Sequence, residues 1–124
     1  MLIFASAAER YAEIVADSGI NAKVAPDAWT RAVDAMVAAI KAGRPGDGFI
    51  AAVELCGAEI LKLCVELGGC LTGEHGVGIE KRDLMGVQFS EVDLAQQMRI
   101  KTAFDPDWLL NPGKVFPLEA RGQQ

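Results

Sequence analysis

The chain has 124 residues, of which 51% are hydrophobic and 23% charged, and its formal net charge is −5. This composition predicts one modest globular domain over residues 1–124 and not a disordered segment. The acidic balance argues against a nucleic-acid groove, and no apolar run approaches the ~20 residues that cross a bilayer, so neither a nucleic-acid partner nor a transmembrane segment is expected.

The N-terminal region, residues 1–43, carries mainly helical signals. Ser6-Ala-Ala-Glu9 has the pattern of a capping box, and apolar residues then recur at helical spacing. We therefore predict a helix over residues 7–18, and short strands at most over Leu2–Phe4 and Ala22–Val24. We assign no role to this region, and it stays an unassigned helical region.

Asp27 follows Pro26 and is a candidate cap for a second helix, which Gly43 should end. The apolar residues of that helix fall on one face, which predicts a core face or a partner interface. They are Trp29, Val33, Met36, Val37 and Ile40.

Arg44–Gly48 has the glycine and proline content of a loop. A strongly apolar third helix is predicted over Ala51–Leu67, and we expect it to be the most buried one, ending at Gly68-Gly69. Cys56 and Cys64 lie in this stretch, where free cysteine behaves as a small core residue.

The three cysteines are odd in number and lack the C-x-x-C spacing, and the chain has one histidine. A zinc site built within the chain is therefore not expected. The same pattern favours a reducing, cytoplasmic setting.

The second half of the chain shows shorter elements. We predict a strand over Cys70–Thr72, one or two helical turns within Glu80–Met85, and a helix capped by the pattern Ser90-Glu-Val-Asp93. Asp105-Pro106 should stop that helix. The residues of that helix expected to face the core are Leu94, Met98 and Ala103. Beyond it we predict a helical turn at 107–110, a turn at 111–114 and a tail at 118–124.

These elements together predict a mainly α fold, a helical fragment with at most a small β-sheet. Thr72–Lys81 is its most distinctive stretch, because it holds the only histidine beside a carboxylate and among three glycines. Glycine lets the backbone approach a flat ligand closely and adopt positive φ. Glycines also make ordinary turns, and a lone histidine is more often structural than catalytic, so both interpretations stand at this point.

Two segments together resemble a known family. GGCLTGEHGVGIEKRDLM (residues 68–85) and IKTAFDPDWLLNPGKVF (residues 100–116) are similar to the C-terminal end of FAD-linked oxidases of the glycolate oxidase D-subunit and D-lactate dehydrogenase type, in the vanillyl-alcohol oxidase superfamily. The resemblance covers residues 58–117. It implies derivation from an α+β parent domain, FAD as the cofactor of the complete enzyme, and oxidation of small 2-hydroxy acids to 2-oxo acids.

The resemblance also implies roles for individual residues. His75 would face the substrate side of the flavin and take the hydroxyl proton, as an imidazole can near neutral pH. Gly73, Gly76 and Gly78 would let the loop pass close to the flavin ring. Glu74, Asn111 and Lys114 occupy the remaining motif positions beside the cofactor.

The chain departs from metal-dependent members of the family, in which Glu74 would supply a carboxylate to a divalent metal. Those members carry an upstream H-x-G-D-G-N-x-H segment, and its nearest match here is RPGDGFIA, residues 44–51. Arg44 and Ala51 stand where the histidines would be, and Phe49 replaces the asparagine. We therefore predict no metal ligand.

No dinucleotide-binding fingerprint follows a strand in this sequence. The first hypothesis is that the chain is the substrate-side portion of such an oxidase, needs an FAD-binding domain or subunit as partner, and is inactive alone. Arg44 and Arg82 are substrate-side candidates by charge only. A second hypothesis is a helical interaction module that forms homo-oligomers through the face that begins at Trp29. A third, an independent enzyme using His75 and Glu74, ranks last, because adjacent side chains generally diverge.

Overall fold

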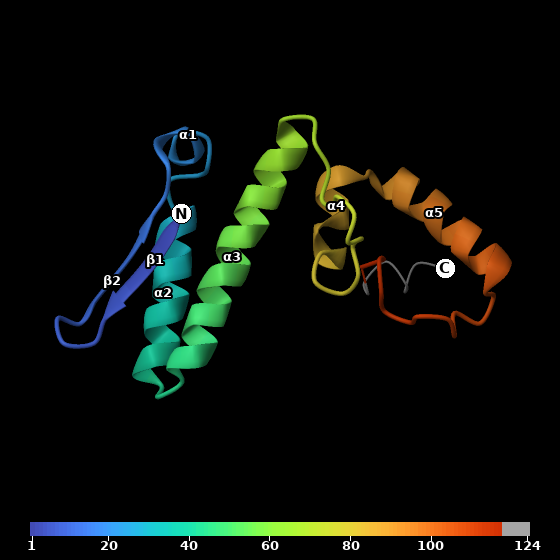
Figure 1. The fold of residues 1–124 in the computed structure, drawn as a ribbon. Helices are drawn as coiled ribbons and strands as arrows, with labels where there is room; N and C mark the ends of the chain where they lie inside the picture. The colour runs from blue at the N-terminus through green and yellow to red at the C-terminus, as the bar shows by residue number, and fades with distance from the viewer. Residues whose placement is uncertain (118–124) are drawn as a thin grey trace. The chain divides into compact units, whose positions relative to one another are not determined.

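The computed structural model describes residues 1–117, so the predicted tail at 118–124 lies outside the described residues. The chain divides into two compact units, Met1–Leu63 and Cys64–Gln124, which are described separately. Helices dominate both units, and the only sheet in the described part of the chain has two strands (Figure 1). The predicted fold class, mainly α with a small sheet, is confirmed.

The first unit opens with a β-hairpin in place of the predicted helix. Strands β1 (Leu2–Ser6) and β2 (Tyr11–Val15) pair antiparallel, with Leu2 opposite Val15 and Ser6 opposite Tyr11. The predicted helix over residues 7–18 was wrong: burial alternates along β2, where Ala12 and Ile14 are covered while Tyr11, Glu13 and Val15 are exposed, which is the geometry of a strand. The Ser6–Glu9 contact does form, since the Glu9 N–H donates to Ser6 Oγ at 3.4 Å, but it serves the hairpin turn.

A single helical turn, α1 (Ser18–Asn21), follows the hairpin. Its N-cap is Asp17, whose carboxylate accepts the Gly19 N–H at 2.8 Å. The predicted strand over Ala22–Val24 was wrong, because these residues form the turn that ends α1.

Helix α2 (Ala28–Lys41) agrees with the prediction and ends where expected. Gly43 has φ of 76°, and its N–H reaches the Ile40 carbonyl at 3.0 Å while the Arg44 N–H reaches Ala39 at 3.0 Å, which is a Schellman ending. Asp27 makes no capping bond, because its backbone is already helical where a cap needs extended geometry. Its carboxylate pairs with Arg31 instead, at 3.3 Å.

The core of this unit joins the hairpin and two helices. It contains Ile14 from β2, Ala32 from α2 and Cys56 from α3 (Pro45–Glu66), with Ile3, Trp29 and Val33 packed against them. The apolar face of α2 is therefore a core face, one of the two roles that the sequence left open. Burial raises the pKa of the Cys56 thiol, as expected for a small core residue.

Helix α3 (Pro45–Glu66) starts inside the predicted loop. Proline suits the first position of a helix, where its missing N–H is not needed, so the loop over Arg44–Gly48 was wrong. Only one narrow stripe of the helix is buried, formed by Gly48, Ala52 and Cys56. The expectation that α3 would be the most buried helix was also wrong, and Cys64 is exposed.

The second unit begins at the end of α3, where Gly68 (φ 86°) and Gly69 complete a second Schellman ending as predicted. Cys70–Thr72 is not a strand, because Leu71 is buried and its N–H donates to the Gln88 side chain at 2.8 Å. The 3₁₀ turn η1 (Arg82–Leu84) and the short helix α4 (Met85–Gln88) then follow.

Helix α5 (Glu91–Phe104) is the main helix of the second unit. The Ser90–Asp93 capping box is confirmed, and so is the burial of Leu94 and Met98. Ala103 is exposed, so its inward position was wrong. The helix stops before Asp105-Pro106 as predicted, but no helical turn follows over residues 107–110.

Candidate functional site

The glycine loop, residues 72–81, lies at the surface of the second unit without regular structure. The His75 side chain is 85% exposed and the Glu74 side chain 90% exposed. Nε2 of His75 lies 3.5 Å from Oε1 of Glu74. The two adjacent side chains thus lie together, whereas we had expected them to diverge. The loop therefore presents an imidazole and a carboxylate together to an incoming group.

The three loop glycines differ in backbone conformation but share open surroundings. Gly76 and Gly78 have φ of 77° and 59°, values that side chains rarely tolerate. Gly73 is not in that region, and a Cβ built on any of the three would meet no atom within 4 Å. The space beside all three is open, which a flat ligand lying on the backbone requires.

Two hydrogen bonds join the terminal segment to the glycine loop and to η1, which follows the loop. The Val115 N–H donates to the Gly78 carbonyl at 2.8 Å, and Nη1 of Arg82 donates to the Gly113 carbonyl at 2.7 Å. The two sequence motifs, residues 68–85 and 100–116, therefore meet in one place.

Asn111 and Lys114 lie in the turn that these bonds hold. Asn111 has φ of 49°, a conformation that asparagine tolerates better than most side chains, and its Oδ1 lies 3.4 Å from Nζ of Lys114. Asn111 thus contacts Lys114 and shapes the turn that carries it.

A pocket of about 480 Å³ opens between the loop and this turn. Of the seven candidate residues, His75, Gly76, Gly78 and Lys114 line it, while Gly73, Glu74 and Asn111 do not. Its other lining residues are Val77, Ile79, Glu80 and Lys81. The pocket thus combines an imidazole, two ammonium groups and a carboxylate, a set that can hold an anion and move a proton.

The start of the terminal segment is anchored by Asp105, whose residue surface is 7% exposed. Its carboxylate accepts from the Lys101 ammonium and from the N–H groups of Leu109 and Leu110, at 3.0 and 2.9 Å. The bond from Lys101, aided by the two N–H groups, holds the pKa of Asp105 below its usual range despite desolvation.

Trp108 ties the same segment to the body of α5. Its indole N–H donates to Thr102 Oγ1 at 2.8 Å, and its ring packs tilted on Phe116 with 5.8 Å between centroids. The segment that delivers Lys114 is therefore fixed at both ends.

Thr72 opens the loop with a buried hydroxyl. Its Oγ1 has no hydrogen-bond partner among residues 1–117. An unsatisfied buried hydroxyl costs about 1–3 kcal/mol, so a group bound beside the loop would gain from pairing with it.

The sequence did not predict Asp105 or Val115 as residues that shape the site. Val115 acts through its backbone, which leaves no side-chain signal, whereas the D-P step at Asp105 was noted only as a helix stop. Arg82 was named by charge as a substrate-side candidate, but its guanidinium is engaged with a backbone carbonyl. Arg44 pairs with Asp47 at 2.8 Å in the first turn of α3.

The described residues contain no group of three or more histidine, cysteine, aspartate or glutamate side chains placed to hold a metal ion. Within the same residues, every helix is too short or too polar to span a membrane.

Comparison with known proteins assigns the motif region. Glycolate oxidase subunit GlcD of Escherichia coli is 51% identical over 76 residues, which cover 61% of this chain and 15% of that protein. GlcD of Bacillus subtilis is 44% identical over 69 residues, covering 56% of this chain and 15% of the relative. The mitochondrial D-lactate dehydrogenase [cytochrome] of Kluyveromyces lactis is 38% identical over 66 residues, which cover 53% of this chain and 12% of that protein.

The chain thus spans about 15% of the length of the first of these relatives. No solved structure matched the chain. The model of the family "FAD linked oxidases, C-terminal domain" matches residues 44–115, more than half of the chain. The match includes both motifs, and the chain belongs to the family of FAD-linked oxidase C-terminal domains.

Proposed function

We propose that this chain is the substrate-side portion of an FAD-dependent oxidase or dehydrogenase of small 2-hydroxy acids, of the glycolate or D-lactate type. The single observation that carries the proposal is the meeting of the two family motifs at one pocket, through the bond between Val115 and Gly78. Relatives named for glycolate and D-lactate support the substrate class.

The site fits a flavin in two respects. The open space beside Gly73, Gly76 and Gly78 allows a flat ring to approach the backbone. The unpaired Thr72 hydroxyl offers a hydrogen bond on the same loop. The flavin, when bound, accepts the two electrons that the substrate loses.

The residues of this chain would position the substrate and move its proton. His75, which is exposed and lines the pocket, would accept the proton of the substrate hydroxyl. Lys81 and Lys114 give the pocket two cations that attract a carboxylate. Glu74, whose Oε1 lies 3.5 Å from Nε2 of His75, would help to hold the imidazole in position.

The remaining parts of the enzyme belong to a partner. We propose that an FAD-binding domain or subunit holds most of the cofactor, and that the chain alone is inactive. The described cysteines are all free, which supports a reducing, cytoplasmic compartment.

The test is a chimera in which residues 44–117 replace the matching C-terminal segment of E. coli GlcD. We expect it to bind FAD and to oxidise glycolate or D-lactate with a dye acceptor, while the full chain mixed with FAD shows no turnover. His75→Asn should lower kcat by about a hundredfold or more, the range for a lost acid–base group, without releasing FAD. Glu54→Gln, at an exposed charge on α3, is the matched control.

A chimera that turns over equally with asparagine at position 75 would refute the role of His75. Turnover by the full chain with FAD alone would refute the need for a partner domain.

A second candidate function, an interaction module that forms homo-oligomers, is favoured by the apolar side chains that α3 exposes. Phe49, Ile50 and Val53 are 40%, 58% and 57% exposed. Light scattering with a flavin titration separates the candidates, because oligomers without flavin affinity support this one.

A further inference from the structure

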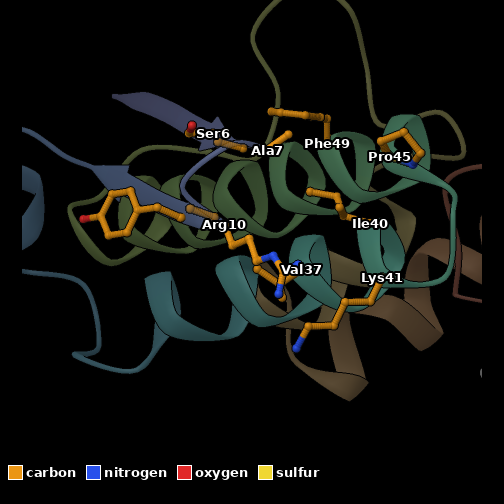
Figure 2. A pocket seen from close by; sticks show the side chains of 11 residues that line it. Ser6, Ala7, Arg10, Val37, Ile40, Lys41, Pro45 and Phe49 are labelled. Carbon is orange, nitrogen blue, oxygen red and sulfur yellow. The ribbon is translucent and has the colours of Figure 1, made fainter.

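A second pocket lies in the first unit and has no part in the glycine loop. It has a volume of about 470 Å³, within the range of roughly 300–1,000 Å³ typical of small-molecule sites. Three elements build it: the hairpin, the last turn of α2 and the first turn of α3 (Figure 2). Its walls are mainly aliphatic and aromatic, from Ala5, Ala7, Tyr11, Ala12, Val37, Ile40, Pro45 and Phe49.

The charged residues that line this pocket are both cations. Arg10 comes from the hairpin turn and Lys41 from the end of α2 (Figure 2). Neither side chain forms a hydrogen bond or ion pair with any residue in 1–117. Two unpaired cations on one apolar pocket favour an anion by charge, although the chain as a whole has a net charge of −5.

The backbone at Arg10 is strained. Its φ is 54°, in the left-handed region that arginine rarely occupies. Glycine or asparagine would close this turn more favourably. The strained arginine instead sits at the pocket, a combination that suggests a binding role, because such strain is concentrated at functional sites.

We propose that this pocket binds an amphipathic organic anion, a carboxylate with an apolar tail. The carboxylate pairs with Arg10 and Lys41, and the tail packs between the hairpin and Ile40 and Phe49. The recognition is independent of flavin and of the 2-hydroxy acid site, since every lining residue lies in the first unit.

Octanoate is the probe, titrated calorimetrically into the full chain, with octanol and acetate as the neutral and tail-less controls. We expect octanoate to bind and both controls to bind at least about tenfold more weakly, because each lacks one half of the recognition. Amide NMR shifts should concentrate at residues 5–12, 37–41 and 45–49.

Arg10→Gly separates binding from folding. It relieves the positive φ, so the hairpin should be as stable as before or more stable, yet octanoate affinity should fall about threefold, as expected for one exposed ion pair. Arg10→Gly with Lys41→Gln should lower it about tenfold. Lys23→Gln removes an exposed charge of the same unit outside the pocket and should leave affinity unchanged.

Equal binding of octanol and octanoate would overturn the proposal, because the cations would then contribute nothing. So would an affinity that survives both substitutions, or shifts that fall outside the pocket. Self-association that prevents octanoate from binding would assign the pocket to a second copy of the chain and would also overturn the proposal.

Discussion

Alanine at two glycines of the glycine loop should have opposite effects on stability. Gly78 has φ of 59°, and its carbonyl is held by the Val115 N–H. Gly73 is outside the left-handed region and has open space where a Cβ would lie. Gly78→Ala therefore tests the conformational role of the loop glycines, and Gly73→Ala tests the role of the open space.

The magnitudes follow from the backbone. A side chain in the left-handed region costs about 1–2 kcal/mol, and the smaller entropy of alanine in the unfolded chain offsets about 0.4–1 kcal/mol. Gly78→Ala should thus lower the free energy of unfolding by about 1 kcal/mol. Gly73→Ala should raise it by about 0.4–1 kcal/mol, because no strain opposes the entropy gain.

Urea unfolding of the full chain measures the difference. In a Trp29→Phe background, the fluorescence of Trp108 reports the second unit alone. With a urea dependence of about 2 kcal/mol/M, the two midpoints should lie roughly 0.7–1 M apart. Gly78→Asn is the matched control, since asparagine tolerates positive φ and should lose less stability than alanine.

Equal changes in the urea midpoint for Gly78→Ala and Gly73→Ala would refute this reasoning. A Gly78→Asn variant that is no more stable than Gly78→Ala would refute it as well. In the GlcD chimera, Gly73→Ala should also weaken FAD retention despite its stabler fold, because its methyl group occupies the open face. Unchanged FAD retention would remove Gly73 from the cofactor site.

Three further predictions concern the site. The pKa of Asp105 is lower in the folded chain than in the unfolded chain, where it is about 4. Its carboxylate therefore stabilises the fold above that pH, and this stabilisation is lost as the pH falls through the lower folded pKa. Asp105→Asn should make the melting temperature fall less steeply as the pH is lowered. Arg82→Gln should release the terminal turn and destabilise the second unit by about 1–2 kcal/mol in urea, with a raised KM in the chimera; an unchanged midpoint would show that the guanidinium bond is dispensable. Thr72→Val should stabilise the chain by about 1 kcal/mol yet weaken FAD retention in the chimera, and a loss of stability would show that the hydroxyl is satisfied.

The elements predicted well are those whose ends carry local chemistry. The Gly43 ending of α2, the Gly68-Gly69 ending of α3 and the Ser90 capping box are all short-range hydrogen-bond patterns, and each forms as expected. Such signals act within a few residues, so a sequence is enough to predict them.

The hairpin was missed because its evidence is not local. Ser6 and Glu9 make the same contact in a turn as in a capping box, and Tyr11, Ile14 and Val15 have helical spacing although β2 buries only Ile14 of the three. The choice of strand over helix depends on pairing with β1 and packing on α2, which only the folded chain supplies. The start of α3 was missed because Pro45 and Gly46 read as loop residues, although proline at a first helical position is favourable.

The candidate site depends both on local sequence motifs and on a long-range contact that forms only in the folded chain. The motif residues were readable, but their meeting depends on a backbone bond from Val115 that any non-proline residue could donate. Its acceptor is specific, because the Gly78 carbonyl is oriented by a left-handed φ that glycine adopts at least cost. The glycine that shapes the loop is thus also the one to which the second motif attaches. A substitution there should weaken both the loop and the position of Lys114, whereas one at Gly73 should affect only what lies against the loop.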